Sequence, residues 1–147
     1  MPAIMFQIIE TYGDIFAQCP SYIPLVHCVS LDMKMSKGIA KVFKHKFGNV
    51  PFLKAQVHSV GQVATLNYGG RFIFYMATKR HFSCKPTYAS LTKSLQTLRT
   101  SMERLGLTHL AMPRIATGLD NLQWPIVKEL VTETFFDSNI TIYVFYI

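Results

Sequence analysis

The stretch MPRIATGLDNLQW, residues 112–124, joins a predicted strand, Thr108–Ile115, to a predicted helix, Asn121–Phe136, through a short turn of small residues. In α/β proteins, ligands bind beyond the carboxyl ends of parallel strands. Backbone N–H groups at a helix start are unpaired and attract phosphate. The stretch therefore predicts an α/β fold with an anion site at this turn.

Asp120 is the acidic residue of the turn, and two interpretations of it are open. As a helix N-cap it would accept hydrogen bonds from backbone N–H groups. A carboxylate beside a phosphate site repels phosphate, so its other role would be a general base near an anionic substrate. This stretch alone does not decide between capping and catalysis.

Predicted strands and helices alternate through the rest of the chain, and a Tyr68-Gly69-Gly70 hairpin lies in the middle. Gly48 stops a helix for which Ser36 is the expected N-cap. The pattern predicts a single α/β domain, residues 1–147, with a mixed sheet between helical layers. The further strands are Phe6–Thr11, Leu25–Ser30, Gln62–Asn67, Arg71–Thr78 and Ile140–Ile147, and the further helices are Pro51–His58 and Thr87–Leu105.

The charge of the chain is uneven. Fifteen Lys and Arg oppose eight Asp and Glu, for a net charge of +7, and five lysines fall between Lys34 and Lys46. Such a run is either a solvated helix face or a surface for an anionic partner. The three cysteines lack CxxC spacing, so we expect reduced thiols, an intracellular protein and no metal site.

His27 lies within the apolar run LVHCVS and is expected to be a hydrogen-bonded core residue rather than a ligand. No apolar run is long enough to span a membrane, and the first ten residues lack the basic region and cleavage site of a signal peptide. We therefore expect no membrane association.

Three features are expected at one rim of the sheet: Gly38-Ile39-Ala40 after the strand ending at Ser30, Lys79 at a strand end, and the turn from Arg114 to Asp120. A lysine at such a position is either a solvated surface residue or an amine nucleophile assisted by the nearby carboxylate. Asp14, after Gly13, either caps the next segment or accepts from an exocyclic amine.

Several short motifs together resemble the macro domain of terminal ADP-ribose protein glycohydrolase. They follow one another in the family's order over nearly the whole chain, and Asp120 lies 41 positions after Lys79. The motifs are GDIF at 13–16, HCVS at 27–30, KGIA at 37–40, FKHKFG at 43–48, TKR at 78–80, KPTY at 85–88 and MPRIATGLDNLQW at 112–124.

The resemblance implies a three-layer α/β/α macro domain with a mixed, mostly parallel central sheet. It also implies an enzyme that hydrolyses mono-ADP-ribose from Glu or Asp side chains of proteins, and O-acyl-ADP-ribose as a further substrate. Lys79 would be the nucleophile and Asp120 the acid/base, with no metal or cofactor. The implied substrate-binding residues are Asp14, Ile15, Ser30, Gly38, Ile39, Arg114, Ile115, Ala116, Thr117, Gly118, Leu119, Phe145 and Ile147.

Two departures from the family pattern bear on substrate preference. Ser36-Lys37 stands where the family tends to have small residues, and this pair either crowds the distal ribose or adds a cation near the phosphates. Ala116 stands where glycine is usual, and a Cβ there is unfavourable if the turn needs a positive φ.

The resemblance also sets the expected partners: ADP-ribose and mono-ADP-ribosylated proteins, bound by a nuclear or cytoplasmic monomer. An alternative is a reader of ADP-ribose or poly(ADP-ribose) without useful catalysis, but a reader needs neither Lys79 nor Asp120. Direct nucleic-acid binding rests on charge alone, and would weaken steeply with salt.

Overall fold

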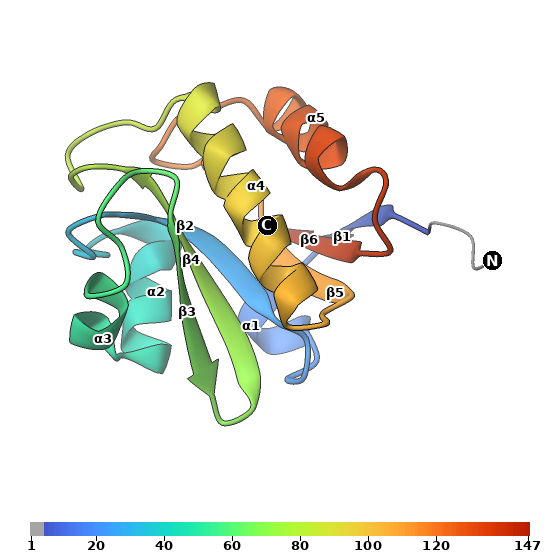
Figure 1. Ribbon diagram of the computed structural model, residues 1–147, viewed down its shortest axis with the longest axis horizontal. Coiled ribbons are helices and arrows are strands. Elements are labelled where there is room, and N and C mark those ends of the chain that lie inside the picture. The colour runs from blue at the N-terminus through green and yellow to red at the C-terminus, as the bar shows by residue number, and fades with distance from the viewer. Residues whose placement is uncertain (1–4) are drawn as a thin grey trace.

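The computed structural model describes residues 5–147, which form a six-stranded sheet with helices on both faces (Figure 1). The strand order is β1-β6-β5-β2-β4-β3, and only β3 is antiparallel to its neighbour. This is the predicted three-layer α/β/α arrangement with a mostly parallel sheet. The strands are β1 (Gln7–Tyr12), β2 (Leu25–Ser30), β3 (Val63–Tyr68), β4 (Arg71–Lys79), β5 (His109–Pro113) and β6 (Thr141–Tyr146).

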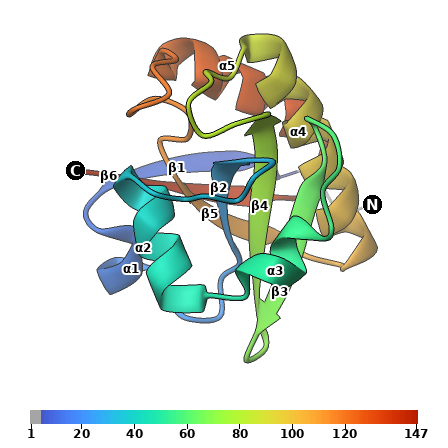
Figure 2. The same cartoon turned by 90° about the vertical axis from the view of Figure 1, so that its left-hand side faces the viewer.

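The helices divide into two layers, which the turned view separates (Figure 2). One layer holds α1 (Ile15–Gln18), α2 (Gly38–Phe47) and α3 (Val50–Lys54); the other holds α4 (Tyr88–Arg104) and α5 (Trp124–Phe135). Because β4 is covered on both faces, its sequence RFIFYMATK is apolar almost throughout.

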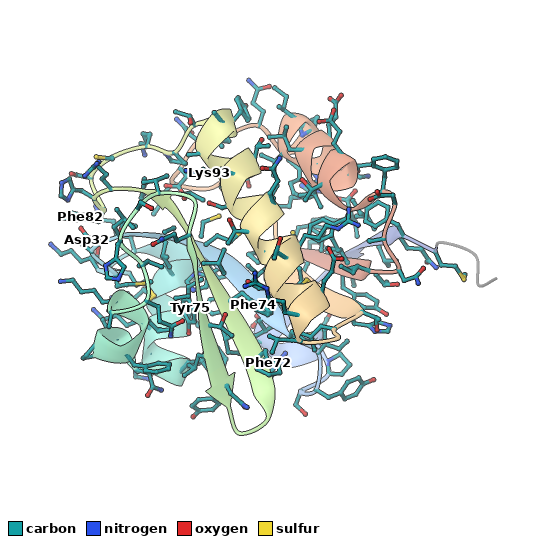
Figure 3. All side chains as sticks on the ribbon, in the orientation of Figure 1. Asp32, Phe72, Phe74, Tyr75, Phe82 and Lys93 are labelled. Atoms are coloured by element: carbon teal, nitrogen blue, oxygen red, sulfur yellow. The ribbon has the colours of Figure 1, made fainter. Side chains whose placement is uncertain are left out.

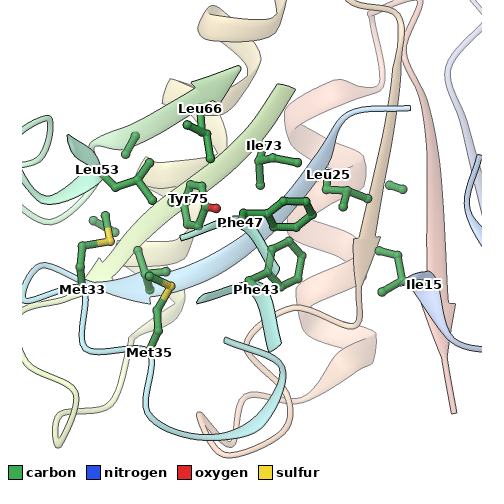
Figure 4. Packing of buried hydrophobic residues seen from close by; sticks show 14 of the residues in the cluster. Ile15, Leu25, Met33, Met35, Phe43, Phe47, Leu53, Leu66, Ile73 and Tyr75 are labelled. Atoms are coloured by element: carbon green, nitrogen blue, oxygen red, sulfur yellow. The ribbon is translucent and has the colours of Figure 1, made fainter. Parts of the chain in front are cut away.

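Alternate residues of β4 enter two separate cores. Ile73 and Tyr75 pack with Phe43 and Phe47 of α2 (Figure 4), whereas Phe74 and Met76 pack beneath α4 and α5. In the predicted apolar stripe of α4, Leu91, Leu95, Leu98 and Met102 are fully buried, as their spacing predicts. The fifth member, Leu105, is 41% exposed, because the helix ends at Arg104. Thr87 caps this helix through a reciprocal pair of hydrogen bonds with Ser90.

Three predicted helix starts and ends differ from the structure. Helix α3 ends at Lys54 rather than at His58. Helix α2 is preceded by Lys37, without a side-chain cap, so the predicted Ser36 N-cap is wrong. Helix α5 begins at Trp124 rather than at Asn121, because Pro125 favours the first turn of a helix.

The later start of α5 decides one question about Asp120. The residue at the helix N-cap is Gln123, so Asp120 is not an N-cap. In the part of the chain that the structure describes, no helix is long and apolar enough to cross a membrane.

Candidate active site

A cleft of about 860 Å³ lies at the carboxyl ends of the parallel strands. It runs from the ends of β1 and β6, across β5 and β2, to the end of β4. All fifteen predicted site residues line it: Asp14, Ile15, Ser30, Gly38, Ile39, Lys79, Arg114, Ile115, Ala116, Thr117, Gly118, Leu119, Asp120, Phe145 and Ile147.

Lys79 and Asp120 meet at the β4 end of this cleft. Nζ of Lys79 lies 2.7 Å from Oδ1 of Asp120, and the two side chains are only 15% and 17% exposed. A register shift between β2 and β4 places Lys79, rather than Thr78, opposite Ser30. Such a bulge re-aims side chains at a strand end. The structure thus brings together two residues that are 41 positions apart in the chain.

The turn after β5 is an irregular loop held by its own hydrogen bonds. The hydroxyl of Thr117 donates to the carbonyl of Arg114 over 2.7 Å, and the N–H of Leu122 donates to the carbonyl of Ala116 over 2.9 Å. Because α5 begins only at Trp124, the prediction that this turn opens directly into a helix is wrong. An anion at this turn would meet loop N–H groups rather than a helix N-terminus.

The start of α2 faces this loop across the cleft. Gly38 has φ +60°, and a Cβ at that position would lie 3.4 Å from Cδ1 of Leu119. Glycine therefore suits both the backbone conformation and the close approach. The two sides of the cleft approach each other at Gly38 and Leu119. The two ends of the cleft lie at different strands, β6 and β4.

Ser30 is tied to the loops at the β4 end through Asp32, which the sequence interpretation did not single out. Asp32 accepts hydrogen bonds from Oγ of Ser30, from the N–H of Lys34 over 3.2 Å and from the N–H of Phe82 over 3.1 Å. Burial of Asp32 opposes ionisation, but these hydrogen bonds outweigh it and lower the pKa of the carboxyl group. Asp32 and Phe82 lie side by side in Figure 3.

The guanidinium group of Arg114 is occupied by protein partners. It stacks 4.0 Å from the ring of Tyr146, and its Nη2 lies 3.4 Å from Oε1 of Glu10. Glu10 also accepts from Nζ of Lys128 and Nε1 of Trp124, each over 2.9 Å. The hydrogen bond from Lys128 is the largest cause of the lowered pKa of Glu10. Nε of Arg114, by contrast, is buried and has no hydrogen-bond partner among the described residues.

The opposite end of the cleft is less polar. Oδ1 of Asp14 accepts from the N–H of Phe16 over 2.9 Å, which is the predicted capping role. Ile15 and Phe145 are buried beside it, while Ile147 is exposed. This end offers an apolar wall with one carboxylate.

The segment after β4 supplies site residues that sequence reasoning missed. Phe82, Ser83 and Lys85 line the cleft. Nζ of Lys85 donates to the carbonyl of Leu119. The hydroxyl of Tyr88 accepts a hydrogen bond from the backbone N–H of Gln123 over 3.1 Å. The KPTY string marked this segment, but no periodicity indicates where an irregular loop folds back.

His27 is a core residue, as expected, but it lacks the expected hydrogen bonds. Its ring stacks on Phe43 with centroids 3.8 Å apart, and among the described residues neither ring nitrogen has a partner. Burial lowers the pKa of His27 to about 3. The side chain therefore stays neutral in the folded protein.

No protein-family model matches the chain. The macrodomain of DarG from Thermus aquaticus shares its fold, with a TM-score of 0.80 and 23% identity, over 96% of this chain and 97% of that one. A Thermosipho africanus DarTG structure in complex with ADP-ribose gives a TM-score of 0.80 and 19% identity, over 95% of this chain and 42% of that one. The fold and the strand-end cleft define a macro domain.

The human ADP-ribose glycohydrolase OARD1 is 47% identical to this chain over 133 residues, which are 89% of this chain and 87% of the human protein. The chain belongs to the ADP-ribose glycohydrolase family of macro domains.

Proposed function

We propose that this protein hydrolyses the bond between ADP-ribose and acidic side chains of modified proteins, and also cleaves O-acyl-ADP-ribose esters. The observation that carries the proposal is the contact between Lys79 Nζ and Asp120 Oδ1, 2.7 Å apart at the β4 end of the cleft. An amine nucleophile needs a neighbouring group to take its proton, and this carboxylate is within reach. Family membership supports the same chemistry.

The proposed placement of ADP-ribose follows the length of the cleft. The adenine would lie at the end formed by Asp14, Ile15 and Phe145. The diphosphate would meet backbone N–H groups of the loop 114–119 and of the α2 start at Gly38. The distal ribose would then reach Lys79, since β4 lies at the other end of the cleft.

The proposed reaction has two steps. Lys79 passes a proton to Asp120, and its nitrogen bonds to the anomeric carbon while the bond from that carbon to the glutamate oxygen breaks. The side chain leaves as a carboxylate. Asp120 releases the proton from Lys79 to solvent. Water then gives a proton to the restored carboxylate of Asp120 and attacks the same carbon while the bond to Lys79 breaks, and the free amine of Lys79 takes the proton back from Asp120. The net change is one water consumed, with ADP-ribose, a free carboxylate and a proton released.

Two variants separate the roles of Lys79 and Asp120. Lys79→Ala should abolish turnover while ADP-ribose binding stays largely intact, because the proposed phosphate contacts lie elsewhere. In Asp120→Ala the first step should be slow, because Lys79 must lose its proton to solvent, and the second step slower still, because no carboxylate activates water. ADP-ribose should therefore accumulate on Lys79, measured as a mass increase on the intact protein. Lys41→Ala, an exposed lysine of α2 outside the cleft, is the matched control.

The outcomes distinguish three models. Wild-type turnover in Lys79→Ala would eliminate the covalent route and favour Asp120 activating water directly. No turnover in the wild-type protein, together with tight ADP-ribose binding, would make the domain a reader. The double variant should carry no adduct.

A further inference from the structure

We propose that an acidic polypeptide segment, flanking the modified residue of the substrate, docks on a basic rim beside the β4 end of the cleft. This inference rests on the proposed function, because it concerns the protein that carries the ADP-ribose. The rim, named here the exit rim, consists of Lys34, Lys37, Arg80 and Phe82, all exposed.

The sheet order places the exit rim where the carrier protein must lie. The proposed reaction occurs at Lys79, at the β4 end, and the rest of ADP-ribose extends toward β6. In the proposed displacement, the glutamate oxygen leaves from the face of the anomeric carbon opposite Lys79. Because the nucleotide fills the cleft toward β6, the carrier protein lies outside the mouth of the cleft at its β4 end. Arg80 follows Lys79 directly, and Phe82 and Lys37 line this part of the cleft.

The cations of the exit rim have no acidic partners in the fold. Among residues 5–147, no ion pair joins Lys34, Lys37 or Arg80 to a carboxylate. The neighbouring acids are already engaged: Asp120 binds Lys79, and both oxygens of Asp32 accept hydrogen bonds. The charge of the rim is therefore available to an outside group.

The position of Lys34 and Arg80 fits a carrier better than it fits the diphosphate, whereas Lys37 adjoins the proposed diphosphate site at Gly38. Lys34 and Arg80 do not line the cleft, so they face what lies outside it. At the opposite end, the guanidinium group of Arg114 is engaged by Glu10 and Tyr146. Lys34 and Arg80 therefore place positive charge outside the cleft, at the end where the modified protein would emerge.

The aromatic residue of the rim favours a peptide over a nucleic acid. Single strands bind through bases stacked on exposed aromatic faces. Nζ of Lys34 lies 3.7 Å from the centroid of the Phe82 ring, so the ammonium group covers that face. The rim therefore presents ammonium groups of lysine and the guanidinium group of Arg80, and both kinds of cation bind carboxylates of Asp and Glu.

The test compares two peptides modified with ADP-ribose on the same glutamate, one flanked by Asp and Glu and the other by Ser and Gln. Wild-type kcat/KM should be higher for the acidic peptide at low salt, by about two- to fivefold for each exposed ion pair, and the ratio should fall as salt rises. Lys34→Glu and Arg80→Glu should each reduce the ratio. Both variants should hydrolyse a small O-acyl-ADP-ribose as the wild type does.

Arg104→Glu makes the same charge change at an exposed position at the end of α4, just before β5 begins and thus away from the carboxyl ends of the strands, and should leave the ratio unchanged. Equal rates for both peptides in the wild type, or a ratio that Lys34→Glu leaves intact, would overturn the docking proposal. Hydrolysis of the small ester in that case would leave the proposed function standing.

A measurement of peptide binding tests the docking proposal independently of catalysis. A fluorescent, unmodified acidic peptide should bind the wild-type protein more tightly than Lys34→Glu, as measured by anisotropy. If a single-stranded oligonucleotide of equal charge displaces it at a lower concentration than the unlabelled peptide does, the rim is a nucleic-acid surface and the peptide proposal is wrong.

Discussion

Ala116 holds a backbone conformation that its side chain disfavours. Its φ is +62°, in the left-handed region, where a Cβ meets the following carbonyl at a cost of about 1–2 kcal/mol. The turn needs this conformation because the N–H of Leu122 bonds back to the Ala116 carbonyl. The substitution of alanine for the family's usual glycine thus places strain in the cleft wall.

Ala116→Gly should raise the free energy of unfolding by about 0.5–1 kcal/mol, because relief of strain exceeds the greater chain entropy of unfolded glycine. Urea denaturation measures the change. Ala89→Gly, in helix α4, is the control and should be destabilising. A loss of stability in Ala116→Gly would mean that packing of its methyl group outweighs the backbone strain.

His27 should make stability depend on pH. The unfolded chain takes up the proton near pH 6.5, whereas the folded protein resists it until about pH 3. Between these values the unfolded state binds more protons, so stability falls as pH falls, by at most about 1.4 kcal/mol per pH unit.

His27→Phe keeps an aromatic ring against Phe43 and removes this titration. The slope of unfolding free energy between pH 6.5 and 4.5 should flatten in the variant. Below pH 4.5 the carboxyl groups of Glu10 and Asp32, whose pKa values are lowered in the folded protein, also contribute to the loss of stability. This loss is the same in the wild type and in the variant. An unchanged slope would show that His27 becomes charged within the folded protein.

At the scale of elements, regular segments were predictable and the connections between them were not. All six strands lie within two residues of their predicted ends, because burial on both faces gives continuous apolar runs bounded by turn residues. The start of α5 was misplaced by three residues. The local sequence pattern does not show that Asp120 pairs with Lys79 of β4 instead of capping the helix that follows it.

The same limit applies to the site. Strand ends identify Ser30, Lys79 and the loop after β5, because parallel strands share one edge. The segment 80–88 contributes through long-range hydrogen bonds, such as Lys85 to Leu119, which leave no periodic trace in the sequence. The family resemblance, rather than spacing, is the basis for predicting that Asp14 and Phe145, which line one end of the cleft, contact adenine.

Lys85 should act by holding the loop that carries Asp120. Its ammonium group binds the carbonyl of Leu119, the residue before Asp120. Lys85→Met should lower kcat more than it weakens ADP-ribose binding, because Asp120 would lose alignment with Lys79. Tyr88→Phe, which removes a second link to this loop, should have a similar and smaller effect.

Kinetics with a small ester, and calorimetry with ADP-ribose, measure the two quantities. Equal losses of kcat and affinity in Lys85→Met would point to direct contact with the ligand instead.

At the scale of the molecule, the cleft joins both halves of the sheet, so its ligand should stabilise the whole domain. ADP-ribose at 100 times its Kd should add about 2.7 kcal/mol, or roughly 5–10 °C in Tm. AMP should give less, because it lacks the distal ribose and one phosphate. Thermal unfolding with each ligand provides the measurement.

Gly118→Val tests whether this stabilisation comes from the loop after β5. Gly118 does not have a positive φ, and a Cβ there would meet nothing within 4 Å, so the variant should fold normally. A valine in the cleft lining should reduce the ADP-ribose shift. An undiminished shift would place the phosphates away from this loop.

The position of β6 has a consequence for synthesis of the protein. Strand β6 lies between β1 and β5, and it supplies the only strand neighbour of β1 within the described chain. Strand β1 is synthesised before β6 and must therefore wait, unpaired, for residues 141–146. Nascent chains halted before this point should remain sensitive to protease near β1, and the end of the cleft lined by Phe145 would form last.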